Sequence, residues 1–87
     1  MTGWAVRPGL HARSLPGATV VVAPDCGTPV VLEGTAEDLW RLLRAPIAID
    51  ELTAELARRY DADPAVVDAD VRAAVDDLAA RGLVVER

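Results

Sequence analysis

Residues 29–40 read PVVLEGTAEDLW, and within them the chain changes from a strand pattern to a helix pattern. The first five of these residues form an apolar, β-branched run, which is typical of a strand. Thr35 and Asp38 resemble a capping box with Asp in place of Glu, so we expect a helix to begin there. The composition agrees, because residues 1–34 contain four of the six prolines and five of the six glycines, whereas residues 35–81 contain no glycine. Strands and turns are therefore predicted first, and helices after them.

Two segments nearer the N-terminus also have strand character. Residues 19–23 (TVVVA) are separated from residues 29–33 by five residues of turn-forming types, which predicts a hairpin. Residues 4–7 (WAVR) alternate large apolar residues with small or polar ones, and a Pro-Gly pair follows them. We expect this segment to be the third strand and the residues after it to form a loop.

The first two helices are predicted from apolar spacing and from their ends. In the first, apolar residues recur at 3.6-residue spacing, at Ala36, Leu39, Trp40 and Leu43. Arg41 and Arg44 suit the negative end of this helix, and Pro46 is expected to end it. Asp50 is expected to cap the second helix, whose apolar positions are Leu52, Leu56 and Tyr60.

The third helix has the clearest boundaries. Asp63 suits the cap position and Pro64 the first helical position, and the helix is expected to run to Arg81 with Gly82 as a left-handed C-cap. Its apolar stripe consists of Val67, Val71, Val75 (or Ala74) and Leu78. Residues 83–85 (LVV) are expected to form a return strand or a packed tail. The prediction is one α+β domain over residues 1–87, winged-helix-like, with a three-stranded antiparallel sheet followed by three helices.

Composition and residue types argue against several functions. A net charge of −5 without any Lys disfavours nucleic-acid binding, which depends on basic side chains that displace counterions. His11, Ser14 and Cys26 are the only residues of their types and lie in predicted loops, so we expect no catalytic site. The aspartates do not fit a calcium loop, and we predict no metal and no cofactor. No signal peptide or membrane span is recognised, which favours a cytoplasmic location.

Val30, Val31 and Leu32 are consecutive apolar residues, so the last strand has hydrophobic side chains on both faces. Helices, loops and Trp4 could cover both faces. Alternatively, a strand edge and an apolar groove stay open, and another chain adds a strand there.

The pattern as a whole resembles a known family. The matching residues are 31–36 (VLEGTA), 39–43 (LWRLL), 50–52 (DEL) through Leu56 to Tyr60, and Asp70 and Val71 through Leu78 to 81–84 (RGLV). This pattern is similar to the PqqD-like family, small peptide chaperones also called precursor-peptide recognition elements. Such domains act in pathways that make ribosomally synthesised, post-translationally modified peptides (RiPPs), including pyrroloquinoline quinone and lasso peptides.

The resemblance implies that the leader segment of a precursor peptide pairs with the third strand, in a groove against the third helix. The residues that it assigns to this site are Val30, Val31, Leu32, Glu33, Val67, Asp70, Val71, Ala74 and Arg81. It also implies a separate modifying enzyme as partner: a radical SAM enzyme, a protease or a cyclase. Two alternatives remain, a winged-helix nucleic-acid binder and a domain that forms homodimers through the open edge.

Overall fold

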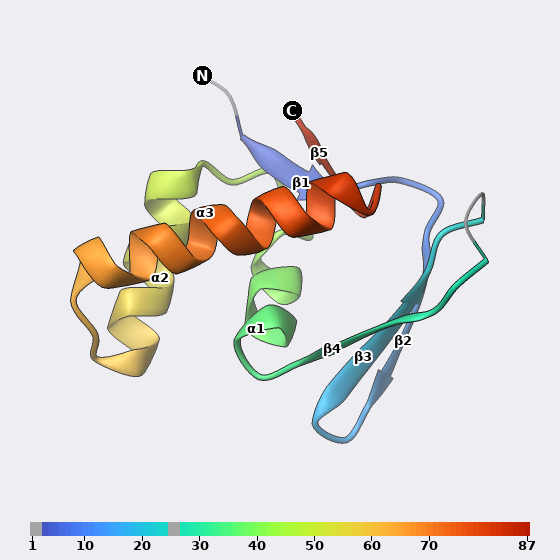
Figure 1. The fold of residues 1–87 in the computed structure, drawn as a ribbon, viewed down its shortest axis with the longest axis horizontal. Helices are drawn as coiled ribbons and strands as arrows, with labels where there is room; N and C mark the ends of the chain where they lie inside the picture. The colour runs from blue at the N-terminus through green and yellow to red at the C-terminus, as the bar shows by residue number, and fades with distance from the viewer. Residues whose placement is uncertain (1–2, 25–26) are drawn as a thin grey trace.

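The computed structural model describes residues 3–24 and 27–87, and Figure 1 shows the course of the chain. In chain order the elements are β1 (Trp4–Val6), β2 (His11–Leu15), β3 (Ala18–Val22), β4 (Val30–Glu33), α1 (Thr35–Leu42), α2 (Ile49–Tyr60), α3 (Pro64–Ala80) and β5 (Val84–Glu86). The α+β class, the antiparallel three-stranded sheet and the three helices are therefore confirmed.

The three-stranded sheet has the order β2-β3-β4, and both of its pairs are antiparallel. A two-residue turn at Pro16 and Gly17 joins β2 to β3, where Gly17 supplies a positive φ of 79°. The predicted pairing of residues 19–23 with residues 29–33 is confirmed by β3 and β4. Its connecting turn contains Asp25 and Cys26, which lie outside the described residues.

The prediction of the third strand was wrong. Residues 4–6 do form a strand, β1, but it pairs with β5 in a separate two-stranded sheet. The third strand of the main sheet is β2 (HARSL), a segment expected to be a loop. All five of its residues are exposed, so no alternation of buried and exposed residues marks it as a strand. It is a strand because the tight turn at Pro16 and Gly17 folds it back onto β3.

Three details of the predicted helix ends were also wrong. The N-cap of α1 is Gly34 at φ 59°, and no side chain caps this helix, so Thr35 and Asp38 form no capping box. Ala48, not Asp50, is the N-cap of α2. Helix α1 ends at Leu42, well before Pro46, and Arg44 therefore lies beyond it.

Helix α3 agrees with the prediction at both ends. The Asp63 side chain accepts a hydrogen bond from the Ala65 amide at 2.9 Å, and Pro64 occupies the first helical position. Gly82 follows the C-cap Arg81 with φ 74°, a conformation that glycine adopts without strain.

Replacing Asp63 with Ala is expected to lower the free energy of unfolding by about 1 kcal/mol, because the first turn of α3 loses its acceptor. In a domain of this size that change corresponds to a Tm about 4 to 8 °C lower. Thermal denaturation followed by circular dichroism would measure it. Asp63→Asn keeps a capping oxygen and should remain near wild type. Equal losses in the two variants would show that the cap hydrogen bond is not the cause.

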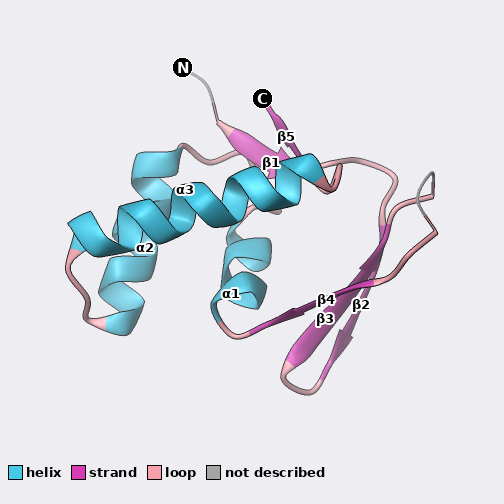
Figure 2. Ribbon diagram, viewed as in Figure 1, coloured by secondary structure: helices cyan, strands magenta, loops and turns pink. Residues whose placement is uncertain are grey.

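One core joins the sheet to the helices. It contains Val21 and Leu32 from the sheet and leucines and valines from all three helices. In Figure 2, α1 lies between the three-stranded sheet and α2, and it contacts both β4 and α2. A buried hydrogen bond, in which the Thr19 hydroxyl donates to Glu37 Oε2 at 2.9 Å, also fastens β3 to α1. Helix α1 therefore determines where the β4 edge lies relative to α2 and α3.

Candidate functional site

Strand β4 is an edge of the three-stranded sheet, and β3 is the only described strand that pairs with it. Leu15 and Ala18 are partners on either side of the two-residue turn at Pro16 and Gly17, the position that forms a hydrogen-bonded pair in such a hairpin. From there, antiparallel partners alternate between hydrogen-bonded and non-hydrogen-bonded pairs. This alternation directs the backbone groups of Val30 and Leu32 toward β3. Those of Val31 and Glu33 are then directed away from the sheet, where an added strand would lie.

The side chains of β4 differ in burial on its two faces. Leu32 is buried in the core beside Thr19, whereas Val31 is 56% exposed on the opposite face. Helices and loops therefore do not cover both faces of this strand. The interpretation with an open edge is the one that the geometry favours.

An apolar groove of about 450 Å³ lies between the helices. Its walls come from the start of α1, the end of α2 and one face of α3, and its lining residues are Thr35, Ala36, Leu39, Leu56, Tyr60, Ala62, Val66, Val67, Asp70, Val71 and Ala74. Thr35 and Ala36 follow the end of β4 after a single residue, Gly34. The open edge and the groove are therefore adjacent along the chain.

The structure brings together four of the predicted site residues in this groove: Val67, Asp70, Val71 and Ala74. The four residues of β4 form the neighbouring edge and are not part of the groove wall. Arg81 is not among the residues that line the groove; it is the C-cap of α3, where its Nε donates to Asp77 Oδ2 at 3.1 Å.

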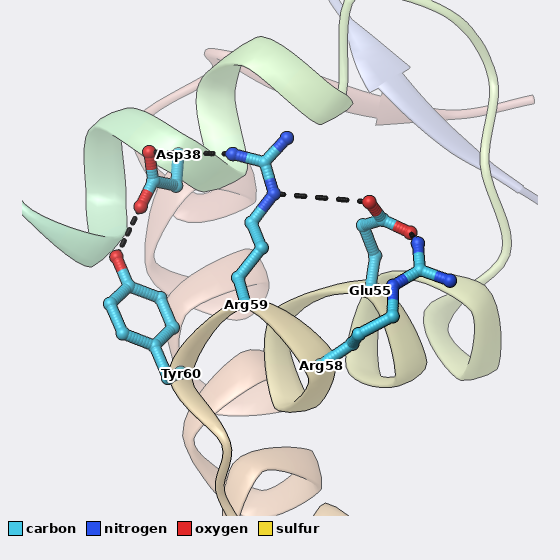
Figure 3. A network of polar contacts seen from close by, with 5 residues as sticks. All are labelled: Asp38, Glu55, Arg58, Arg59 and Tyr60. Carbon is cyan, nitrogen blue, oxygen red and sulfur yellow. Dashed lines mark hydrogen bonds and ion pairs between the residues drawn. The ribbon is translucent and has the colours of Figure 1, made fainter.

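Tyr60 is a groove residue whose role the sequence analysis missed. It was expected on the apolar stripe of α2, but its side chain is 49% exposed and its hydroxyl donates a hydrogen bond to Asp38 of α1. Figure 3 shows this contact continuing to Arg59 and Glu55, with 3.9 Å between Arg59 Nη1 and Asp38 Oδ1. The network ties the end of α2 to the start of α1 at the rim of the groove. In the sequence, the feature that could have indicated this contact was the hydroxyl group of the tyrosine.

The pKa of Tyr60 is raised, chiefly because its hydroxyl donates to the Asp38 carboxylate. Ionisation of the phenol would place two negative charges together, so the folded state favours the neutral form. The contact therefore contributes its full stabilisation below the ordinary tyrosine pKa of about 10. That contribution is lost as the pH rises through the higher pKa of the folded state.

On α3, Arg72 lowers the pKa of Asp68, because its guanidinium donates to Asp68 Oδ2 at 2.9 Å. A lowered carboxyl pKa contributes stability at a pH above the ordinary pKa of the group, and this stability is lost as the pH falls.

Replacing Arg72 with Met is expected to return the Asp68 pKa toward its ordinary value, which an NMR titration of the carboxyl carbon would measure. Arg81→Met, which removes the partner of Asp77, should leave Asp68 unchanged. A persistently low Asp68 pKa in the Arg72 variant would contradict this assignment.

Within the described ranges 3–24 and 27–87, no three His, Cys, Asp or Glu residues are grouped so that they could hold a metal ion. In the same part of the chain, no helix combines the length and apolar character that crossing a bilayer requires.

The fold and the site define a class: winged-helix-like domains with a free strand edge beside an apolar groove. The family model of coenzyme PQQ synthesis protein D (PqqD) matches residues 18–84, and the chain belongs to this family. The resemblance inferred from the sequence is thereby confirmed. Among curated proteins, none matches the chain.

Two solved structures share the fold. One is TbiB1 in complex with the TbiA(β) leader peptide, with a TM-score of 0.85 and 20% identity over 92% of this chain and 93% of that chain. The other is the solution structure of the PqqD truncation of Methylobacterium extorquens PqqCD, described as a functional, stand-alone RiPP recognition element. It has a TM-score of 0.76 and 22% identity over 95% of this chain and 88% of that chain.

Proposed function

We propose that this domain binds the leader segment of a ribosomally synthesised precursor peptide without catalysing a reaction itself. The leader would add an antiparallel strand to β4 and place apolar side chains in the groove against α3. The observation that carries the proposal is the free β4 edge, with outward backbone groups at Val31 and Glu33, beside an apolar groove of about 450 Å³. Membership of the PqqD family and the fold shared with leader-bound TbiB1 support it.

The energetics require both parts of the site. The donors and acceptors of Val31 and Glu33 allow four hydrogen bonds, and each is worth about 0.5 to 1.5 kcal/mol net. Micromolar binding needs about 8 kcal/mol. The remainder must come from apolar side chains in the groove, each worth about 1.5 to 3 kcal/mol when fully buried. The leader is therefore expected to combine an extended backbone with at least one or two large apolar residues.

The nucleic-acid alternative is disfavoured by the charges of α3. Arg72 is the only basic residue between positions 64 and 80, and it is paired with Asp68 at 2.9 Å and with Asp50 at 3.8 Å. A recognition helix needs basic side chains that are available to phosphates. Helix α3 instead presents mainly aspartates and alanines to solvent.

The bound leader would be presented to a separate modifying enzyme: a radical SAM enzyme, a protease or a cyclase. In the proposed site, the groove wall consists of Val67, Asp70, Val71 and Ala74. The strand edge consists of Val30, Val31, Leu32 and Glu33. Arg81 would contact only a leader long enough to reach the far end of α3. A cytoplasmic location stays a prediction.

Fluorescence anisotropy with labelled synthetic peptides tests the proposal. The peptides would tile the short open reading frames beside the gene, and scrambled versions of each would serve as controls. One tile should bind saturably in the micromolar range, and its scrambled version should not. If no peptide binds at a concentration 200-fold above the expected micromolar dissociation constant, or if scrambled peptides bind equally well, the leader-binding function is wrong.

A further inference from the structure

The three-stranded sheet has a second face, which points away from the core. Thr19, Val21 and Leu32 are buried on the core side, so the residues that alternate with them point outward. We call this surface the outer face; besides His11 and Ala18, its residues are Arg13, Leu15, Val20, Val22, Val31 and Glu33. The helices lie on the other side of the sheet (Figure 1).

The outer face is apolar at its centre and open to solvent. Leu15 is 45% exposed and Val31 is 56% exposed, and both are among the large hydrophobic residues that the described chain leaves uncovered. A shallow hollow of about 360 Å³ lies over β2 and β3, beside Val20 and Val22. Uncovered valine and leucine side chains on a sheet favour packing against another apolar surface.

Two opposite charges flank this apolar centre. Arg13 lies on the β2 edge opposite Val20, and Glu33 lies on the β4 edge opposite Ala18, one row further along. Among the described residues, neither side chain forms an ion pair within the molecule. One face therefore carries both halves of a possible ion pair, on opposite edges.

We propose that the outer face is a self-association surface that packs against the same face of a second copy of this chain. A two-fold axis along β3 exchanges the two edge strands. It brings Val20 and Val22 of the two copies together at the axis. Arg13 of each copy then lies over β4 of the other copy, one row, or about 7 Å along the strand, from Glu33. Sheets pack about 10 Å apart, a gap that these two long side chains span.

The size of the face sets the strength of this dimer. Three strands about 4.8 Å apart and five residues at about 3.4 Å each give a face of roughly 14 by 17 Å. Two such faces bury less than the approximately 1,000 Å² expected of a stable interface. The dimer should therefore be weak.

Packing through the outer face leaves the β4 edge of both copies free. A dimer that paired β4 with β4 would instead occupy the backbone groups to which a leader would bind. The two arrangements therefore respond differently to a strand-adding peptide, and the outer-face dimer does not depend on the proposed leader-binding function.

Sedimentation equilibrium of the full chain from about 10 µM to 1 mM tests the proposal. The wild type should shift from monomer toward dimer across this range. Leu15→Asp should weaken association at least tenfold, whereas Ser14→Asp, which adds the same charge on the same strand but on the core side, should not. Circular dichroism would confirm that both variants are folded.

A charge exchange identifies the contact itself. Arg13→Glu and Glu33→Arg should each weaken the dimer several-fold, and the double variant should restore it, because the two-fold axis recreates each ion pair with its signs reversed. The proposal is overturned if the wild type stays monomeric at 1 mM, or if Leu15→Asp associates normally. It is also overturned if the double variant is no better than the single ones, or if a peptide that binds β4 dissociates the dimer.

Discussion

Replacing Val31 with Pro is expected to weaken leader binding at least tenfold while the domain stays folded. The Val31 amide is directed to the open edge, so the substitution removes a donor that an added strand would use. Its side chain is 56% exposed, so the core loses nothing. Proline is tolerated on an edge strand when its nitrogen faces solvent. Anisotropy with the peptide that binds the wild type would measure the loss.

A matched control lies on the opposite edge of the same sheet. By the same alternation, the Ala12 amide on β2 also points away from the sheet. Ala12→Pro therefore makes the same chemical change at an edge that no leader should use, and binding should stay within twofold of the wild type. If the two proline variants bind the peptide equally well, the leader does not pair with β4.

Replacing Val71 with Asp is expected to destabilise the protein strongly. Val71 is 1% exposed and belongs to the core as well as to the groove floor. An unpaired carboxylate there costs more than about 3 kcal/mol, in a domain whose total stability is about 4 to 13 kcal/mol. Urea denaturation followed by circular dichroism would show the loss as a lower midpoint or as a missing transition.

Val66→Asp provides the comparison on the same helix, because Val66 is 62% exposed. We expect it to change the free energy of unfolding by less than about 0.5 kcal/mol. Its effect on peptide binding then reports on the groove rather than on the fold. A Val71→Asp variant as stable as Val66→Asp would contradict the placement of Val71 in the core.

The parts of the fold that local chemistry determines could be predicted from the sequence. The start of α3 follows from Asp63 and Pro64, and its end from Gly82, because each acts within one helical turn. Strand β2 could not be predicted, because its pairing depends on the turn before β3 and its residues carry no burial pattern. The capping prediction at Thr35 failed because Gly34, with its positive φ, occupies the N-cap position.

The candidate site, like the fold, could be predicted from the sequence only in part. The periodicity of α3 predicted Val67 and Val71 on one stripe, with Ala74 as an alternative to Val75, and the structure places Val67, Val71 and Ala74 together in the groove. The contribution of Tyr60 depends on a tertiary contact with Asp38, which lies 22 residues away in the sequence. Spacing within a single helix contains no information about such a contact.

Amide hydrogen exchange, read residue by residue by NMR with and without saturating peptide, tests strand addition to β4 most directly. We predict that the amides of Val31 and Glu33 exchange at least tenfold more slowly when the peptide is bound, whereas those of Ala12 and Ser14 on the β2 edge do not change. Saturable binding with unchanged exchange at Val31 and Glu33 would contradict strand addition to this edge.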